Sequence, residues 1–118
     1  MANERKTENL VRDLLRAKGH YVDQTVIVEE QRSDNARITK LLKSASKAGG
    51  GAGMPEFILT CSRFPDLIIV IECKAKVTHH RSAALDQYKN FACDGALLYA
   101  SYLSKSYDVI AIGVSGES

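Results

Sequence analysis

Residues 49–76 read GGGAGMPEFILTCSRFPDLIIVIECKAK, and we expect the rest of the chain to be built around this stretch. Two runs within it, Pro55–Thr60 and Leu67–Cys73, are apolar and rich in β-branched residues. A short polar break, Cys61–Asp66, separates them. This pattern predicts two strands joined by a tight connection.

Charged residues lie at the end of the second, more hydrophobic strand. Side chains alternate between the two faces of a strand, so Glu72 and Lys74 are expected to point the same way. Antiparallel pairing about Phe64 places Glu56 directly opposite Glu72, where two carboxylates repel each other. The residues expected on the opposite, apolar face are Leu67, Ile69, Ile71 and Cys73. Two carboxylates and a lysine arranged in this way predict a cation-binding site.

Pro55-Glu56 is followed, after fifteen residues, by Glu72-Cys73-Lys74. This arrangement resembles the PD-(D/E)xK motif of restriction-endonuclease-like nucleases. The glycine-rich run before Pro55 is also similar to the stretch that precedes the motif in many of these enzymes. A hairpin with charged strand ends is the alternative interpretation.

The sequence differs from the usual motif at one position, and it contains a second Pro-Asp pair, a decoy, that does not fit the motif. Glu56 stands where the family more often has aspartate, so its carboxylate reaches further by one methylene group. Pro65-Asp66 is the decoy, because only five residues separate Asp66 from Glu72 and both would lie on or beside one strand.

Length and composition predict one soluble domain over residues 1–118. Hydrophobic residues make up 45% of the chain and charged residues 25%, which is ordinary for a globular protein. The net charge of +2 means that nucleic-acid binding would have to depend on local clusters of cations. Three cysteines without CxxC spacing indicate a reducing compartment. With no signal peptide and no apolar run of roughly 18 residues, we expect a cytoplasmic protein without a membrane partner.

Asn3–Lys18 is expected to form an amphipathic helix that ends at Gly19. The residues expected to face the core are Leu10, Val11, Leu14, Leu15 and Ala17. Glu8 borders this apolar face. In the resembling family a glutamate on the first helix often joins the metal site, so the resemblance implies this role for Glu8. A solvated glutamate stabilised by the helix dipole is the alternative.

A strand is expected over Tyr21–Glu30, followed by a helix over Ser33–Lys47 with Ser33 as its cap. The inward residues of this helix are expected to be Ile38, Leu41, Leu42 and Ala45. Its other side carries the cations Arg37, Lys40, Lys43 and Lys47. These cations form either a solvated helix face or a surface that contacts DNA phosphates, with Lys43 and Lys47 as the candidates.

Ala48–Gly53 contains four glycines and lacks the GKS or GKT of a P-loop. We expect a loop whose backbone approaches a ligand closely, and disorder without ligand is the alternative. On the other side of the strand pair, Val77–Arg81 is expected to be a loop with His79 and His80 in solvent. Candidate cationic contacts to DNA in this region are Lys76, His79, His80 and Arg81.

Ser82–Cys93 is expected to be a helix that packs beside the end of the Glu72–Lys74 strand. The apolar members of this helix are Ala83, Ala84, Leu85, Tyr88 and Phe91. Many nucleases of the resembling group carry a glutamine here within a Q-x-x-x-Y pattern, which implies a site role for Gln87. Phe91 replaces the tyrosine of that pattern, and an ordinary exposed glutamine is the alternative.

Asp94-Gly95 is expected to break this helix before a further helical piece over Ala96–Ser104. A final apolar strand, Val109–Val114, is expected to be buried in the sheet. The resulting order, α-β-α-β-β-α-α-β, predicts an α/β fold with a mixed central sheet flanked by helices.

The span from the first helix through DGALLYASYLSKSYDVIAIGVSG, residues 94–116, resembles the N-terminal nuclease domain of type I and type IIG-like restriction enzymes. In those enzymes the chain continues into an adenine methyltransferase or a motor. The resemblance therefore implies DNA as the substrate, and methyltransferase, motor or specificity domains as partners in a longer chain or complex. A stand-alone relative and a dimer are both compatible with the sequence.

The resemblance implies metal-dependent hydrolysis of DNA phosphodiester bonds. Hard oxygen ligands suit Mg²⁺, for which Mn²⁺ can substitute. The implied ligands are the carboxylates of Glu56 and Glu72, the backbone carbonyl of Cys73, and Glu8. Lys74 would orient the attacking water and stabilise the charge that develops on the phosphate.

Three other functions are compatible with the sequence. One is a nucleic-acid-binding module of the same fold that does not cut, and another is a junction resolvase or repair nuclease, which would need a dimer and a broad basic face. The third is a cysteine-dependent enzyme that uses Cys61, Cys73 or Cys93 with His79 or His80. The presence of both glutamates and the lysine of the motif favours the nuclease, and Cys73 is expected to point into the core.

Overall fold

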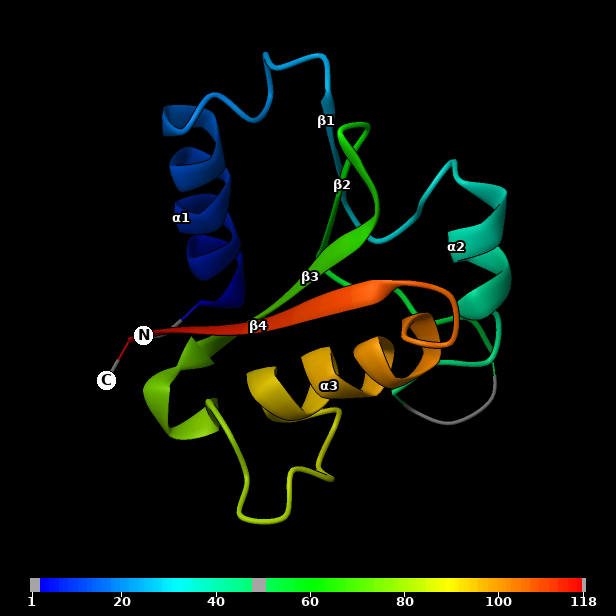
Figure 1. Cartoon of the computed structure of the whole chain (residues 1–118). Coiled ribbons are helices and arrows are strands. Elements are labelled where there is room, and N and C mark those ends of the chain that lie inside the picture. Colours follow the sequence, from blue (N-terminus) through cyan, green and yellow to red (C-terminus); the bar gives the residue numbers. More distant parts are fainter. Residues whose placement is uncertain (1–2, 48–50, 118) are drawn as a thin grey trace.

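A mixed sheet of four strands forms the centre of the molecule (Figure 1). The computed structural model describes residues 3–47 and 51–117. Within the sheet the strands lie in the order β1 (Val26–Glu29), β2 (Phe57–Cys61), β3 (Phe64–Lys76) and β4 (Asp108–Glu117). The first three strands pair antiparallel, and β3 pairs parallel to β4. The predicted α/β class with a mixed sheet is confirmed.

Helices cover both faces of this sheet (Figure 1). One face packs against α1 (Glu4–Ala17). The helix and this face of the sheet together form a core of Val11, Leu15, Phe57, Leu59, Ile71 and Cys73. The other face packs against α2 (Ala36–Leu41) and α3 (Ala92–Leu103), with a core of Ile38, Leu42, Ala45, Ile58, Ile68, Val70, Tyr99, Leu103 and Tyr107. Odd and even residues of β3 therefore enter different cores, as strand alternation requires.

The β2–β3 hairpin has the predicted register. Phe57 pairs with Ile71 and Ile58 with Val70, which corresponds to the expected midpoint at Phe64. An irregularity at Thr60/Cys61 shifts the last pair next to the turn. The second strand is longer than predicted, because β3 begins at Phe64 and continues to Lys76.

The first helix is confirmed, but part of its predicted apolar face is wrong. Asn3 caps α1 by accepting from the Arg5 backbone N–H, and Gly19 ends the helix segment with a φ of 80°. Leu10 and Leu14 are 54% and 63% exposed, respectively. The residues of α1 that are buried follow a strict spacing of four: Thr7, Val11 and Leu15. The helix thus touches the sheet along a narrow line.

The next two elements are shorter than predicted. Asp23 accepts from the Thr25 backbone N–H in a turn, so the predicted strand over Tyr21–Glu30 starts only at Val26. Asn35, and not Ser33, caps α2, because its side chain accepts from the backbone N–H groups of the first turn. The helix ends at Leu41, although Leu42 and Ala45 are buried as expected.

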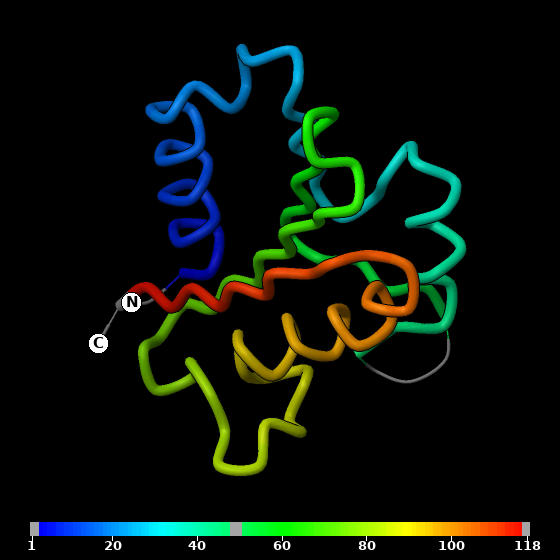
Figure 2. Tube along the Cα trace, in the orientation of Figure 1, coloured from blue at the N-terminus to red at the C-terminus, as the bar shows by residue number. Residues whose placement is uncertain are grey.

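The predicted helix over Ser82–Cys93 is wrong. Figure 2 shows the chain between η1 (Val77–His79) and α3 as an open loop. The buried Asp94 carboxylate in the first turn of α3 accepts from the backbone N–H groups of Ser82 and Gln87 and from the Ser82 hydroxyl. Asp94-Gly95 therefore lies within the N-terminal part of α3 and does not break a helix, so a single helix stands where two were predicted.

The last strand and the glycine run also differ from expectation. The strand β4 lies at an edge of the sheet, where Ile110 and Ile112 remain exposed, so the prediction of a buried strand is wrong. Of the glycine run, residues 48–50 lie outside the described residues. Gly53 is buried, and a Cβ there would come within 2.9 Å of Ala45 and closer still to Tyr99. Packing thus requires this glycine whether or not a ligand approaches it.

Among the described residues, no helix is long and apolar enough to cross a membrane.

Candidate metal centre

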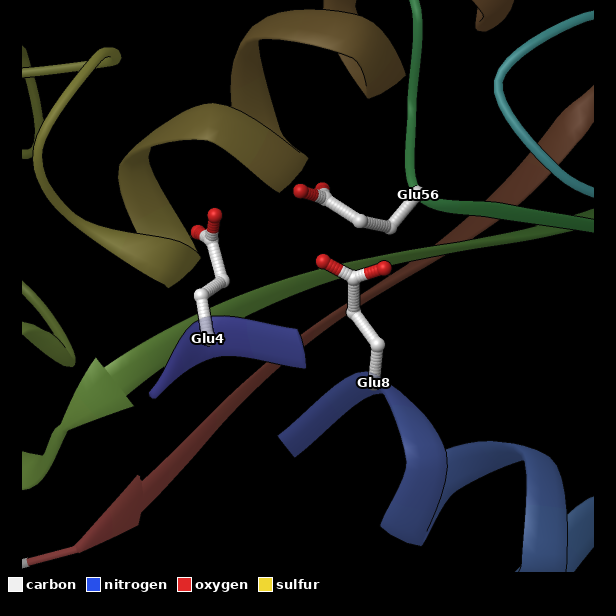
Figure 3. Close-up of side chains that lie close together, drawn as sticks. All are labelled: Glu4, Glu8 and Glu56. Atoms are coloured by element: carbon white, nitrogen blue, oxygen red, sulfur yellow. The ribbon is translucent and has the colours of Figure 1, made fainter. Parts of the chain in front are cut away.

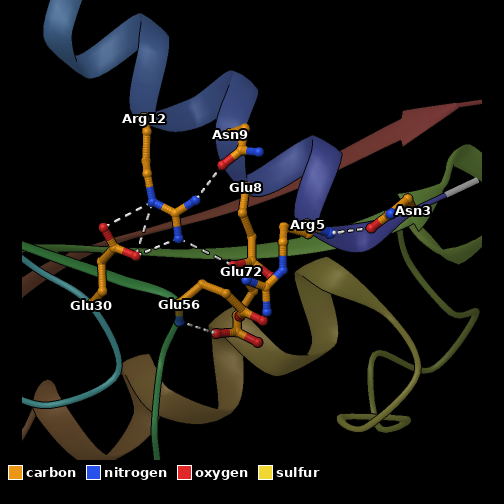
Figure 4. Close-up of polar contacts among 8 residues, drawn as sticks. All are labelled: Asn3, Arg5, Glu8, Asn9, Arg12, Glu30, Glu56 and Glu72. Carbon is orange, nitrogen blue, oxygen red and sulfur yellow. Dashed lines mark hydrogen bonds and ion pairs between the residues drawn. The ribbon is translucent and has the colours of Figure 1, made fainter.

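The start of the β2–β3 hairpin places two carboxylates beside each other. Phe57 and Ile71 are the first pair of the ladder, and Glu56 and Glu72 lie next to them. The backbone N–H of Glu56 donates to Glu72 Oε1 over 2.8 Å (Figure 4). Glu72 is completely buried. Its side chain therefore holds the start of β2 in place.

The second oxygen of Glu72 binds a lysine. Lys47 Nζ lies 2.6 Å from Glu72 Oε2, and the Lys47 side chain is only 19% exposed. Burial works to lower the pKa of Lys47, but the charge and hydrogen bond of Glu72 outweigh it, so the pKa is raised. Lys47 therefore does not lie on a solvated helix face, because α2 ends at Leu41 and the Lys47 side chain points to the carboxylate, whereas its contact with DNA phosphates stays a prediction. Lys43 is exposed as expected.

Glu56 carries the most perturbed carboxylate of the centre. Its Oε2 atom is buried, and no described group donates a hydrogen bond to it. Burial, and then the neighbouring Glu72 carboxylate, raise the pKa of Glu56 to about 9. A carboxylate in this environment is stabilised by a proton or by a cation.

The N-terminal turns of α1 add two more carboxylates. Glu4 and Glu8 are one helical turn apart and point toward Glu56 (Figure 3). One carboxylate oxygen from each of the three residues lies within 4.8 Å of the other two. The structure thus brings Glu8 to Glu56, as the resemblance implied. Sequence reasoning missed Glu4, although its spacing of four from Glu8 was a usable signal.

Lys74 lies on the same side of β3 as Glu72. Its Nζ donates to the Lys89 backbone carbonyl over 2.8 Å and lies 3.4 Å from Glu4 Oε1. Lys89 precedes α3, the helix whose Gly95 lies against Glu72. The predicted shared face of Glu72 and Lys74 is therefore confirmed, and Glu4 connects Lys74 to the carboxylate cluster.

An ion-pair network holds Glu8 from the outside. Arg12 Nη2 lies 3.4 Å from Glu8 Oε1, and the same guanidinium donates to both oxygens of Glu30, the residue after β1 (Figure 4). Asn9 accepts a further hydrogen bond from Arg12. These contacts orient Glu8 through a fixed guanidinium.

The remaining candidates lie elsewhere. The Gln87 side chain is exposed, and its backbone N–H bonds Asp94. Lys76, His79 and Arg81 are exposed, and the His79 ring contacts Phe91 edge-on. His80, by contrast, is not a solvent-exposed loop residue, because it contacts Cys93 Sγ at 3.5 Å and Ser115 Oγ at 3.0 Å.

Neither Cys73 nor Cys93 resembles a nucleophilic cysteine. The Cys73 side chain packs in the α1 core, as strand alternation predicts, and burial raises its pKa far above the usual range. Cys93 lies beside His80, yet burial raises its pKa as well. A reactive cysteine requires a lowered pKa and a base beside it. A hydrogen bond from the Arg63 backbone lowers the pKa of Cys61, but His79 contacts Phe91 and His80 contacts Cys93 and Ser115, so neither histidine of the hypothesis is placed to serve Cys61 as a base.

Comparison with known proteins finds a relative among restriction enzymes. No family model and no solved structure matches the chain. The chain is 33% identical, over an alignment of 132 positions, to the type II restriction enzyme and methyltransferase RM.BcgI of Heyndrickxia coagulans. This alignment covers 99% of the chain and 19% of the relative, so the chain spans about a fifth of the relative's length. This similarity confirms the expected relationship to restriction enzymes. The chain is related, over nearly its whole length, to one part of such an enzyme.

Proposed function

We propose that this chain is a metal-dependent endonuclease domain that hydrolyses DNA phosphodiester bonds as the cleavage module of a restriction-modification system. The observation that carries the proposal is the convergence of three carboxylates, from Glu4, Glu8 and Glu56, next to Glu72 and Lys74 of the PD-(D/E)xK-like motif. The similarity to a restriction enzyme supports the same function.

The donor set fits a hard divalent cation. Carboxylate oxygens are the ligands that Mg²⁺ and Mn²⁺ prefer, and Mg²⁺ binds through few protein carboxylates while it keeps several waters. The buried Glu56 Oε2 without a described donor is the kind of atom that a cation would satisfy. We propose Glu56, Glu72 and Glu8 as ligands, together with the Cys73 backbone carbonyl, and add Glu4 on the basis of its position.

The protein groups of this centre have separate roles in the proposed reaction. A bound Mg²⁺ would polarise the phosphate and lower the pKa of a water. The Lys74 ammonium, held by the Lys89 carbonyl and Glu4, would orient the attacking water and stabilise negative charge on the phosphoryl oxygens. Arg12 fixes Glu8, and Glu72 fixes the start of β2.

The experiment is a cleavage assay with matched variants. Wild type, Glu56→Gln, Lys74→Met and Asp66→Asn are incubated with supercoiled DNA and Mg²⁺, Mn²⁺ or EDTA. We expect cleavage by wild type and by Asp66→Asn, whose carboxylate is the exposed decoy, and a loss of at least about 100-fold in the other two, since a single catalytic group contributes this much. Normal cleavage by Lys74→Met would contradict the assigned role.

One observation favours a second function. Lys47 already neutralises the Glu72 carboxylate, as a permanent lysine counter-ion would in a nuclease-like module that binds nucleic acid without cutting. DNA binding by all four proteins, without cleavage and without metal binding, would support that module.

A further inference from the structure

The Lys47–Glu72 ion pair has no role in the proposed reaction. Glu72 is fully buried and uses both of its oxygens, one for the Glu56 backbone N–H and one for Lys47. A buried carboxylate requires a partner for its charge, and Lys47 supplies it. The Lys47 ammonium thus supplies, at Glu72 Oε2, the positive charge that a metal ion bound to this oxygen would supply.

The surrounding helix leaves room for this pair. A Cβ on Gly95 of α3 would lie 3.3 Å from Glu72 Oε2 and 3.2 Å from Lys47 Cδ, which is tighter than ordinary side-chain contact. The Tyr99 ring, one turn further along α3, lies 5.9 Å from Lys47 Nζ and faces the cation. The absence of a side chain at Gly95 and the Tyr99 ring therefore leave space on α3 for the Lys47 side chain. The Lys47–Glu72 ion pair is thus part of the packing of the fold.

We infer that Lys47 is the internal counter-ion of the centre, which holds Glu72 in place without metal and is displaced from Glu72 Oε2 when a divalent cation binds. The inference rests on the proposed metal centre. Both cations require the same oxygen, and an ammonium in contact with a divalent ion would be strongly repelled. Lys47 is thus a positioning residue that competes with the metal.

Lysine acetylation measures the displacement in the wild-type protein. Samples with and without Mg²⁺ or Mn²⁺ are treated with acetic anhydride, and the extent of modification at each lysine is read by mass spectrometry. Lys43 is the internal control, since it is exposed on the same segment. We expect slow modification of Lys47 without metal and an increase of at least about tenfold with metal, since buried paired amines must be released before they react. Lys43 should not change.

Calorimetric metal titration of the same samples separates two kinds of failure. Metal binding with a Lys47 that stays protected would overturn the inference and leave the proposed function standing. Absence of metal binding would overturn the proposed metal centre, and the inference with it.

Variants test the competition directly. Lys47→Met should bind Mg²⁺ roughly tenfold tighter or more, because the competing charge is gone and each decade of affinity needs only about 1.4 kcal/mol. Lys47→Arg keeps the cation and should stay near wild type, as should Lys43→Met. Weaker metal binding by Lys47→Met, with native circular dichroism, would contradict competition and leave Lys47 a purely structural residue.

Discussion

Among single residues, the carboxylates of the candidate metal centre are paired with cationic side chains. Four glutamates meet at one end of the sheet, and Lys47, Lys74 and Arg12 face them. Each of these cations pairs with a different carboxylate, while Glu56 has no described cationic contact of its own. Among the described carboxylates of the centre, Glu56 is thus the one with a buried oxygen that lacks a hydrogen-bond donor when no cation is bound.

The raised pKa of Glu56 predicts how stability depends on pH. With a pKa of about 9 when folded and 4.5 as its ordinary value, Glu56 keeps its proton between these limits while the unfolded chain releases it. Stability should therefore fall as pH rises from about 4.5 to 9. In EDTA, the free energy of unfolding of wild type should fall by about 2 kcal/mol more than that of Glu56→Gln when the pH is raised from 5 to 8. The partial exposure of Glu56 keeps this difference below the full value that the pKa shift would give.

Urea unfolding across this pH range provides the measurement, with Asp66→Asn as the exposed control. Parallel pH profiles for wild type and Glu56→Gln would contradict a protonated Glu56 in the folded protein.

At the scale of elements, the segment after β3 shows how tertiary contacts override local pattern. Ser82–Cys93 carries apolar residues at helical spacing, yet Leu85 has a φ of 57°, which an α-helix excludes. Asp94 organises this loop with its buried carboxylate, and Gly95 is placed inside α3 because a side chain would meet Glu72 and Lys47. An Asp-Gly pair normally signals a turn, and only packing shows why it lies inside the start of a helix here.

The Asp94 contacts predict a matched pair of variants. Asp94→Ala removes three hydrogen bonds to Ser82 and Gln87 and should lower the free energy of unfolding by about 2–4 kcal/mol. Asp86→Ala, at an exposed position of the same loop, should change it by less than about 0.5 kcal/mol. Urea unfolding gives both values, and limited proteolysis should cut the loop faster only in Asp94→Ala. Equal stability of the two variants would show that Asp94 does not organise the loop.

At the scale of the whole molecule, the centre joins parts that are distant in sequence. Glu4 and Glu8 come from the first helix, Lys47 follows α2, and Glu56 and Glu72 belong to the hairpin. A cation bound there would connect α1 to the sheet. Ligand binding to the folded state alone raises its stability by mass action.

Metal should therefore raise the melting temperature. At 100 times its dissociation constant, a single bound ion contributes about 2.7 kcal/mol, which corresponds to a shift of roughly 10 °C for a domain of this size. Glu4→Gln and Glu8→Gln should reduce the shift produced by Mg²⁺ or Mn²⁺, while Asp13→Asn, exposed on the same helix, should not. Thermal unfolding followed by circular dichroism measures the three. An undiminished shift in both glutamate variants would exclude α1 from the centre.

The sequence alone determined the sheet class, the first helix, the hairpin and the facing positions of Glu56 and Glu72. These follow from local rules, because strand alternation and turn position set register without knowledge of the rest of the chain. The same rules placed Lys74 on the side of Glu72.

The partners of these residues depend on tertiary packing. Lys47 reaches Glu72 across 25 positions, Glu4 joins Glu56 from another element, and Asp94 organises a loop that resembles a helix in sequence. Charge pairing and close packing depend on which atoms become neighbours after folding. Periodicity reports the faces of single elements, and those neighbours are set only when the elements pack together.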